Sequence, residues 1–250
     1  MPTARSTVTS MGGGRTIETI WIDNPPVNAI TTEVSDGMRR SLERLSPEVG
    51  VVVIRGRGEK AFSAGADLAS ITGDGSPPAG IQPLAELIEA LPVPVVAAIH
   101  GHCLGGGLEV ALACDLRIAR EDAKLALPEV GLGMIPGGGG TQRAPRLIGP
   151  GRATWLMMSA TRLTAAEGEA WGLVELVVDD LDEGIARVAG TIAAQSPTAL
   201  RELKQLLRAT REKSDYRAEL DAFARCVASD DGREGIAAFL EKRAPIWPGP

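Results

Sequence analysis

Residues 100–109 read HGHCLGGGLE, and their three consecutive glycines join two apolar segments of different length. The segment before the glycines, residues 95–99, has the length and composition of a strand that is buried on both faces. The segment that begins with them, residues 105–114, is long enough for a helix and carries a single charge. A strand that leads directly into a helix is the repeating unit of an α/β fold, so this stretch predicts the fold class.

The same alternation extends on both sides of this stretch. Apolar or β-branched runs at residues 16–23, 51–55 and 116–119 predict further strands, and residues 31–45 and 83–91 predict helices. The first of these helices would bury one face, formed by Val34, Met38, Leu42 and Leu45.

After residue 151 the strand pattern ends and only helical periodicity remains. Helices are expected over residues 152–159, 165–171, 181–194, 197–210, 216–228 and 233–243. The chain is therefore predicted to have three parts: a flexible tail over residues 1–15, an α/β core over residues 16–190 and a helical region over residues 191–250. Residues 73–80, rich in glycine and proline, predict a mobile loop that could act as a lid.

The bulk composition narrows the class of function. The chain has 250 residues, of which 44% are hydrophobic, so one large globular domain can form. Its formal net charge of −6 argues against a nucleic-acid partner, which usually binds a basic surface. Cys103, Cys114 and Cys226 are odd in number and irregularly spaced, so we expect neither disulfides nor a metal site. No apolar run suits a signal peptide or a membrane span, which predicts a cytoplasmic protein without a membrane partner.

The glycine triplet predicts a cluster of backbone donors. Gly105, Gly106 and Gly107 would open the helix, and the N–H groups at a helix N-terminus have no partner within the helix. Because glycine has no Cβ, a ligand carbonyl could approach these donors closely, as in an oxyanion hole. A tight turn that needs glycine for packing explains the triplet equally well.

Glu109 and Glu129 are single carboxylates in apolar surroundings. Glu109 is the one charge of residues 105–114, and Glu129 lies within the apolar residues 125–133. Burial disfavours an ionised carboxylate and raises its pKa, which suits acid–base chemistry. Each residue also has a structural interpretation: Glu109 could accept from the amides of its own helix, and Glu129 could face solvent on a loop.

Two further loops are candidates for ligand contacts. Residues 135–143, IPGGGGTQR, lack the Gly-Lys-Ser/Thr ending of a P-loop, so they are either a flexible turn or a backbone placed against a ligand or a water. Residues 61–68, AFSAGADL, follow the strand over 51–55 and would lie at the carboxyl edge of the sheet, where α/β proteins bind ligands. Asp67 could equally be the N-cap of an ordinary strand-to-helix connection. Ser63 lacks a nucleophile elbow and a convincing histidine partner, so a serine hydrolase is not expected.

In this order, the segments resemble the crotonase superfamily of enoyl-CoA hydratases and isomerases. The resemblance extends from residue 16 to residue 247, and its strongest parts are residues 62–67, 100–109, 128–143, 171–174 and 229–243. It implies an α/β fold with a crotonase-like ββα-superhelix core and a C-terminal helical trimerisation region. It also implies an enoyl-CoA hydratase, which adds water in syn fashion across the 2,3-double bond of a 2-enoyl-CoA thioester to give a 3-hydroxyacyl-CoA.

The resemblance implies a role for each candidate residue. Glu109 would activate the water, and Glu129 would deliver a proton to C2 of the acyl group. The N–H groups of Ala66 and Gly106 would hold the thioester oxygen. The residues implied in substrate binding are Val27, Ala29, Ala64, Asp67, Leu68, Gly105, Pro128, Gly137, Phe239 and Lys242. Coenzyme A would be part of the substrate, with no separate cofactor. The family also implies a homotrimer or a dimer of trimers, in which Phe239 and Lys242 could reach coenzyme A from a neighbouring subunit.

Residues 24–27, NPPV, depart from the pattern of many hydratases. Those relatives carry a basic residue near this turn that contacts a phosphate of coenzyme A. Phosphate binding would then depend on Lys242 or on arginines that the sequence does not single out.

Three other functions remain open. An enoyl-CoA isomerase needs one carboxylate, at the Glu129 position, so Glu109 favours hydration without forbidding isomerisation. A relative that acts on a branched, aromatic or carboxylated acyl-CoA, including decarboxylases and hydrolases, would differ in its acyl pocket, which residues 68–91 are expected to form. A non-enzymatic scaffold that binds coenzyme A or RNA is opposed by the acidic charge and by the two glutamates.

Overall fold

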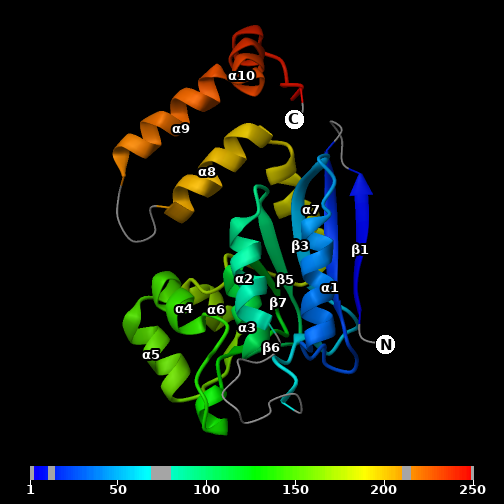
Figure 1. The fold of residues 1–250 in the computed structure, drawn as a ribbon, viewed down its shortest axis with the longest axis vertical. Helices are drawn as coiled ribbons and strands as arrows, with labels where there is room; N and C mark the ends of the chain where they lie inside the picture. The colour runs from blue at the N-terminus through cyan, green and yellow to red at the C-terminus, as the bar shows by residue number, and fades with distance from the viewer. Residues whose placement is uncertain (1–2, 11–14, 69–79, 210–214, 249–250) are drawn as a thin grey trace.

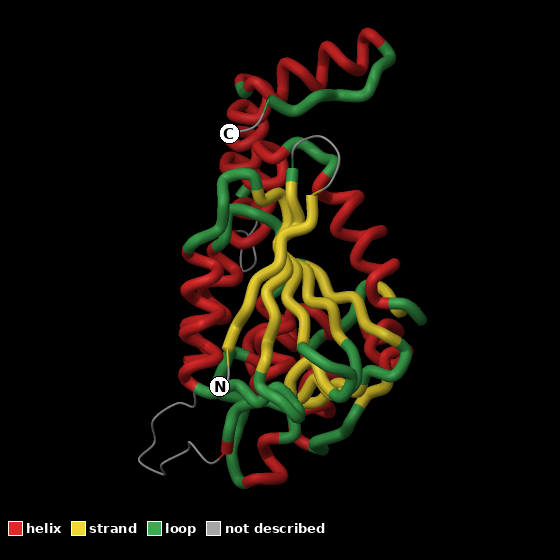
Figure 2. Tube along the Cα trace, turned by 90° about the vertical axis from the view of Figure 1, so that its right-hand side faces the viewer, coloured by secondary structure: helices red, strands yellow, loops and turns green. Residues whose placement is uncertain are grey.

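The computed structural model describes residues 3–10, 15–68, 80–209 and 215–248 (Figure 1). This part of the chain forms a six-stranded sheet, a four-stranded sheet and a set of C-terminal helices. Seen from the side, the long strands of the larger sheet run between helices on both of its faces (Figure 2).

The larger sheet has the strand order β1-β2-β3-β5-β7-β10. Its strands are β1 Thr3–Ser10, β2 Thr16–Asp23, β3 Val49–Gly56, β5 Val95–Ile99, β7 Leu116–Arg120 and β10 Leu176–Val178. Strand β1 pairs antiparallel with β2, and the other neighbouring strands are parallel. The apolar runs of β3 and β5 are buried along almost their whole length, as expected for parallel strands that are covered on both faces.

Alternate residues of the larger sheet enter two separate cores. Helices α1 Thr32–Glu43, α2 Ile81–Ala90 and α3 Gly106–Ala113 cover one face, and α7 Leu181–Ala193 covers the other. Val52 and Ile54 of β3 belong to the core under the first group, whereas Val51 and Val53 belong to the core under α7. This period of two follows from the alternating side chains of a strand, and it holds the helices at fixed positions over the sheet.

A second sheet repeats the path of the chain through the first. Its short strands are β4 Ala61–Ser63, β6 His102–Leu104, β8 Lys124–Ala126 and β9 Leu163–Thr164, in the order β4-β6-β8-β9. Strands β3, β5 and β7 are each followed by one of the first three short strands. The helices that come next are α2, α3, and the 3-10 helix η3 Glu129–Leu132 with α4 Gly140–Ile148. This repeated β-β-α unit forms the superhelical core that the resemblance implied.

The C-terminal helices extend from the core toward one end of the molecule. They follow α5 Pro150–Met158 and α6 Ala165–Trp171, and they are α8 Pro197–Ala209, α9 Tyr216–Ala228 and α10 Asp230–Glu241. Lys204 fixes α8 to the core, because its Nζ donates to the carbonyl of Val93 (2.9 Å) and lies 2.7 Å from Asp115 Oδ2. Helices α9 and α10 lie beyond α8, at the opposite end of the molecule from α3 (Figure 1).

The structure changes the predicted organisation at three points. Part of the expected N-terminal tail is strand β1, because its backbone pairs with the edge of β2 over its whole length. The expected boundary at residue 190 lies inside α7, so that helix belongs with the core. Helix α4 was not predicted, and it begins at a glycine and contains Pro145.

Two other expectations concern loops and membranes. Of the loop predicted over residues 73–80, only Gly80 lies within the described part of the chain. Among the described residues, no helix has the length and the apolar composition that crossing a membrane requires.

Candidate active site

Most of the predicted site residues meet in one cavity of about 340 Å³. It lies at the N-terminus of α3, beside η3 and the loop that follows β4. The predicted residues that line it are Val27, Ala29, Ala64, Ala66, Asp67, Leu68, Gly105, Gly106, Glu109, Pro128, Glu129 and Gly137. The parallel strands of the ββα repeat bring these loops to the same edge of the two sheets, where α/β proteins usually bind ligands.

Two backbone N–H groups lie close together in the wall of this cavity. Ala66 forms a parallel β-bridge with Ile30. In this bridge Ile30 is hydrogen-bonded to the two neighbours of Ala66 in sequence. Ile30 N–H donates to Gly65 O (2.8 Å), and Asp67 N–H donates to Ile30 O (3.1 Å). Because peptide groups alternate in direction along an extended chain, the Ala66 N–H is turned away from Ile30. Gly106 is the first residue of α3, and a Cβ added to it would lie 3.3 Å from the Ala66 nitrogen. This geometry suits two donors that share one ligand oxygen.

Glu109 lies in the first turn of α3 and is almost completely buried. Its Oε1 accepts from the N–H groups of Gly138 (2.7 Å), in the loop before α4, and Gly140 (2.8 Å), the first residue of α4, and not from its own helix. A Cβ on Gly138 would lie 2.6 Å from Glu109 Oε2, so a larger residue at that position would displace the carboxyl group. Burial raises the pKa of Glu109, and the two N–H donors and the positive charge of Arg143 oppose this rise.

Glu129 is the first residue of η3, directly after Pro128. Its side chain is half-buried, and Oε2 has no hydrogen-bond partner among the described residues. Burial is the main cause that raises the pKa of Glu129 to about 7, and the negative charge of Glu109 acts in the same direction. A Cβ on Gly105 would lie 3.0 Å from Glu129 Oε1, so this carboxyl group reaches the N-terminus of α3.

The two carboxyl groups have unlike surroundings. Two N–H groups stabilise the charged form of Glu109, whereas the unpartnered oxygen of Glu129 favours its neutral form. Because each carboxylate disfavours the charge of the other, the two groups are expected to titrate as a pair. The cavity therefore holds one carboxyl group whose surroundings favour the charged form and one whose surroundings favour the neutral form, which is the combination that a general base and a general acid require.

Two predicted residues, Phe239 and Lys242, are not brought to this cavity. Phe239 lies on α10 with an exposed ring, and Lys242 is the left-handed C-cap of that helix. Helix α10 is at the opposite end of the molecule from α3 (Figure 1). Their contact with coenzyme A stays a prediction that requires a second copy of the chain.

The structure adds lining residues to which the sequence assigned no individual role, although each lies in a stretch that was singled out. They are Gly65, Ile81, Leu132, Met134 and Ile135. Apolar residues in a glycine-rich segment are a weak individual signal, so residues 132–135 were included only as part of residues 128–143. Ile81 belongs to residues 68–91, which were expected to form the acyl pocket without any one residue being assigned.

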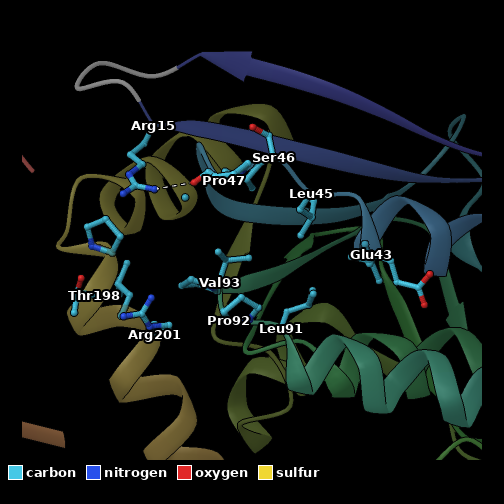
Figure 3. Close-up of a pocket in the computed structure, with 16 residues that line it drawn as sticks. Arg15, Glu43, Leu45, Ser46, Pro47, Leu91, Pro92, Val93, Thr198 and Arg201 are labelled. Atoms are coloured by element: carbon cyan, nitrogen blue, oxygen red, sulfur yellow. Dashed lines mark hydrogen bonds between the residues drawn. The ribbon is translucent and has the colours of Figure 1, made fainter. Parts of the chain in front are cut away.

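A second cavity, of about 390 Å³, lies at the amino ends of β3 and β5, between α8 and the core (Figure 3). Leu45, Leu91 and Val93 contribute apolar walls, and Arg15 donates to the carbonyl of Pro47 (3.2 Å). Glu43 is the one acidic residue of its described lining, so a pair of carboxyl groups is missing there. Within the described residues, no cluster of three or more His, Cys, Asp or Glu side chains could hold a metal ion. The reacting groups are therefore expected in the smaller cavity.

Comparisons with known proteins identify the family and the fold of the chain. The family model described as "Enoyl-CoA hydratase/isomerase" matches residues 12–250. A protein named "Probable enoyl-CoA hydratase" from Bacillus subtilis (strain 168) is 40% identical over 247 residues, which cover 93% of this chain and 95% of that protein. "Carnitinyl-CoA dehydratase" from Salmonella typhi is 38% identical over 92% of this chain and 94% of that protein. The crystal structure of an enoyl-CoA hydratase from Bacillus anthracis has a TM-score of 0.89 at 36% identity, covering 98% of this chain and 99% of that chain. These matches confirm the predicted fold, and the chain belongs to the enoyl-CoA hydratase/isomerase family, the crotonase superfamily of acyl-CoA enzymes.

Proposed function

We propose that the protein is an enoyl-CoA hydratase that adds water across the 2,3-double bond of a 2-enoyl-CoA thioester. The observation that carries this proposal is the pair of unlike carboxyl groups in one cavity, Glu109 and Glu129. Addition of water to a double bond needs a base for the water and an acid for the carbon, and this pair can supply both. The names of two relatives, a hydratase and a dehydratase, describe opposite directions of such a reaction and support the proposal.

Each group in the cavity then has a chemical task. The thioester oxygen lies between the N–H groups of Ala66 and Gly106, which stabilise the negative charge that develops on it. Glu109 takes a proton from a water whose oxygen forms a bond to C3. The electron pair of the double bond moves toward the thioester carbonyl, and C2 takes a proton from Glu129. Glu109 has then gained the proton that Glu129 has lost, and one proton exchange returns the pair to its starting state.

The cavity favours an apolar, uncharged acyl group. Its apolar side chains include Leu68, Ile81 and Met134. Its described ionisable residues, Asp67 and the two glutamates, are all acidic and none is basic, so a carboxylated acyl group would be desolvated in this lining without a counter-charge. The described lining also has no aromatic ring, which is the usual partner of a quaternary ammonium group such as the one in carnitine.

We expect 2-enoyl-CoAs with an uncharged aliphatic acyl group to be hydrated with the highest kcat/KM. A 2-enoyl-CoA of similar length that ends in a carboxylate should be hydrated more than about tenfold less efficiently, because its charge would be buried without a partner. Loss of the absorbance of the conjugated thioester measures both reactions. A 3-enoyl-CoA of the same length belongs in this panel, and its conversion to the conjugated isomer at a higher kcat/KM than hydration would show an isomerase instead.

The rate of hydration is expected to fall as the pH rises through about 7, because Glu129 then loses the proton that it must deliver to C2. A proton donor works only in its protonated form, and the pKa of Glu129 is raised, so activity is present below this pH and lost above it. On the acid side the rate should fall when Glu109 is protonated, which begins above the usual range of a glutamate because its pKa is also raised. A pH profile of kcat/KM measures both limbs, and a profile without a basic limb would contradict the assignment of Glu129 as the acid.

A further inference from the structure

Arg143 is a buried residue of α4 with two partners on different elements. Its Nη1 donates to the carbonyl of Gly138 (2.8 Å), and its Nη2 donates to Glu89 Oε2 on α2 (2.7 Å). The side chains of Arg143 and Glu89 are about nine-tenths buried, so water screens this ion pair only weakly. Arg143 does not line the cavity that holds Glu109 and Glu129. Any effect of Arg143 on the reaction therefore has to pass through the protein groups that it contacts, because it does not touch the substrate.

The hydrogen bond from Arg143 to the Gly138 carbonyl lies between the two N–H groups that donate to Glu109. The N–H of Gly138 belongs to the peptide group before this residue, and the N–H of Gly140 belongs to the peptide group two units later. Both donate to Glu109 Oε1, at 2.7 and 2.8 Å. The carbonyl that Arg143 holds belongs to the peptide group between them. Because neighbouring peptide groups are linked by only two soft dihedral angles, fixing the middle group restrains the donors on both sides.

The loop is shaped around this guanidinium group. Gly139 has a φ of +101°, and a Cβ placed on it would lie 1.9 Å from Arg143 Nη1. The backbone therefore passes so close to the charge that only glycine fits, in a conformation that other residues rarely adopt. Three glycines in succession would be a mobile segment without such a restraint, since glycine has the largest backbone freedom. The ion pair with Glu89 holds the guanidinium group in place from the other side.

We propose that Arg143 is a positioning residue for the reaction: it orders the peptide groups of residues 138–140, and these groups aim the carboxylate of Glu109 at the water. This inference rests on the proposed hydration, and it assigns a role in that reaction to a residue that lies outside the cavity. Glu89 contributes by fixing the guanidinium group between α2 and α4. Lysine cannot replace arginine fully, because a single ammonium group cannot reproduce the planar fork that reaches both Gly138 and Glu89.

The test compares Arg143→Lys with Arg146→Lys, which makes the same change one turn later on α4 at an exposed position. We expect Arg143→Lys to lower kcat by roughly 10- to 100-fold with little change in KM, because a misplaced base affects the chemical step more than substrate binding. The control variant should keep the wild-type kcat. Arg143→Lys should cost less than about threefold when it is added to Glu109→Gln, since residues that act through one another are not additive. Equal losses in both backgrounds would overturn the inference.

A second readout separates positioning from a general loss of stability. Arg143→Met removes the positive charge that opposes the rise in the Glu109 pKa, so the acid limb of the pH profile should move to higher pH. A purely structural role would leave that limb in place, and this result would also overturn the inference. If the wild-type protein hydrates none of the thioesters, the proposed function fails, but the titration of the Glu109 carboxyl group remains measurable by infrared difference spectroscopy against Glu109→Gln. An unchanged titration in Arg143→Met would then reject the role of Arg143 as well.

Discussion

Replacing Glu109 by glutamine is expected to lower kcat for hydration by roughly 10²–10⁴-fold, the usual contribution of a general base. Glutamine keeps the shape of the side chain, and its carbonyl oxygen can still accept from the N–H groups of Gly138 and Gly140. An amide cannot take a proton from water at neutral pH, so the loss comes from the chemistry and not from the fold. Initial rates with a short 2-enoyl-CoA measure the effect.

The control for this substitution is Glu86→Gln, the same change at an exposed position of α2. It should leave kcat unchanged. The thermal midpoint of Glu109→Gln should equal or exceed that of the wild type, because an uncharged amide avoids the cost of burying a carboxylate. A Glu109→Gln variant that hydrates at the full rate would exclude this residue as the base.

Replacing Glu129 by glutamine is also expected to lower kcat for hydration by roughly 10²–10⁴-fold, but because a different proton transfer is lost. Glu129 is the group that exchanges a proton with C2, whereas Glu109 acts on the water. The two variants should therefore differ in a partial reaction, the exchange of the C2 protons of a saturated acyl-CoA in heavy water. Glu109→Gln should keep this exchange, because the acid and the two N–H donors remain, and Glu129→Gln should lose it. Proton NMR of the acyl chain measures the exchange.

This pair of variants also tests the assignment of roles. Exchange that is lost in Glu109→Gln and kept in Glu129→Gln would reverse the two roles. Glu129→Asp is the matched control, because it keeps an acid but moves it back by one methylene group, and it should retain part of the hydration rate. The basic limb of the pH profile should be absent from the residual activity of Glu129→Gln, since the group whose pKa is about 7 has been removed.

The segments with strong periodicity could be predicted from the sequence. Of the predicted apolar face, Val34, Met38 and Leu42 are buried in α1 as expected, because their spacing matches one side of a helix. The fourth member, Leu45, lies beyond the end of α1 and is half-buried. Strands β2 and β5 begin and end at the predicted residues. Helix α4 was missed because glycine at its start and Pro145 within it disfavour a helix locally, and packing against α3 and α5 overrides that preference.

The strands of the second sheet could not be predicted from the local sequence pattern. Strands β4, β6 and β8 have three residues each, which is too short for any alternation to be recognised. They exist because each continues a long strand of the first sheet and finds a parallel partner far away in sequence. Strand β1 is similar, since its pairing with β2 and not its own composition defines it.

The sequence by itself determined which groups are available for the chemistry: two lone glutamates and glycine-rich backbone next to apolar segments. It could not decide between a catalytic and a structural role for either glutamate, because that depends on neighbours more than ten residues away. The tertiary structure supplied these neighbours: it places the donors of residues 138 and 140 on Glu109, and among the described residues it gives Glu129 Oε2 no hydrogen-bond partner. It also placed Arg143 behind the loop. The pKa of a carboxyl group is set by burial, hydrogen bonds and nearby charge, and all three are properties of the folded chain.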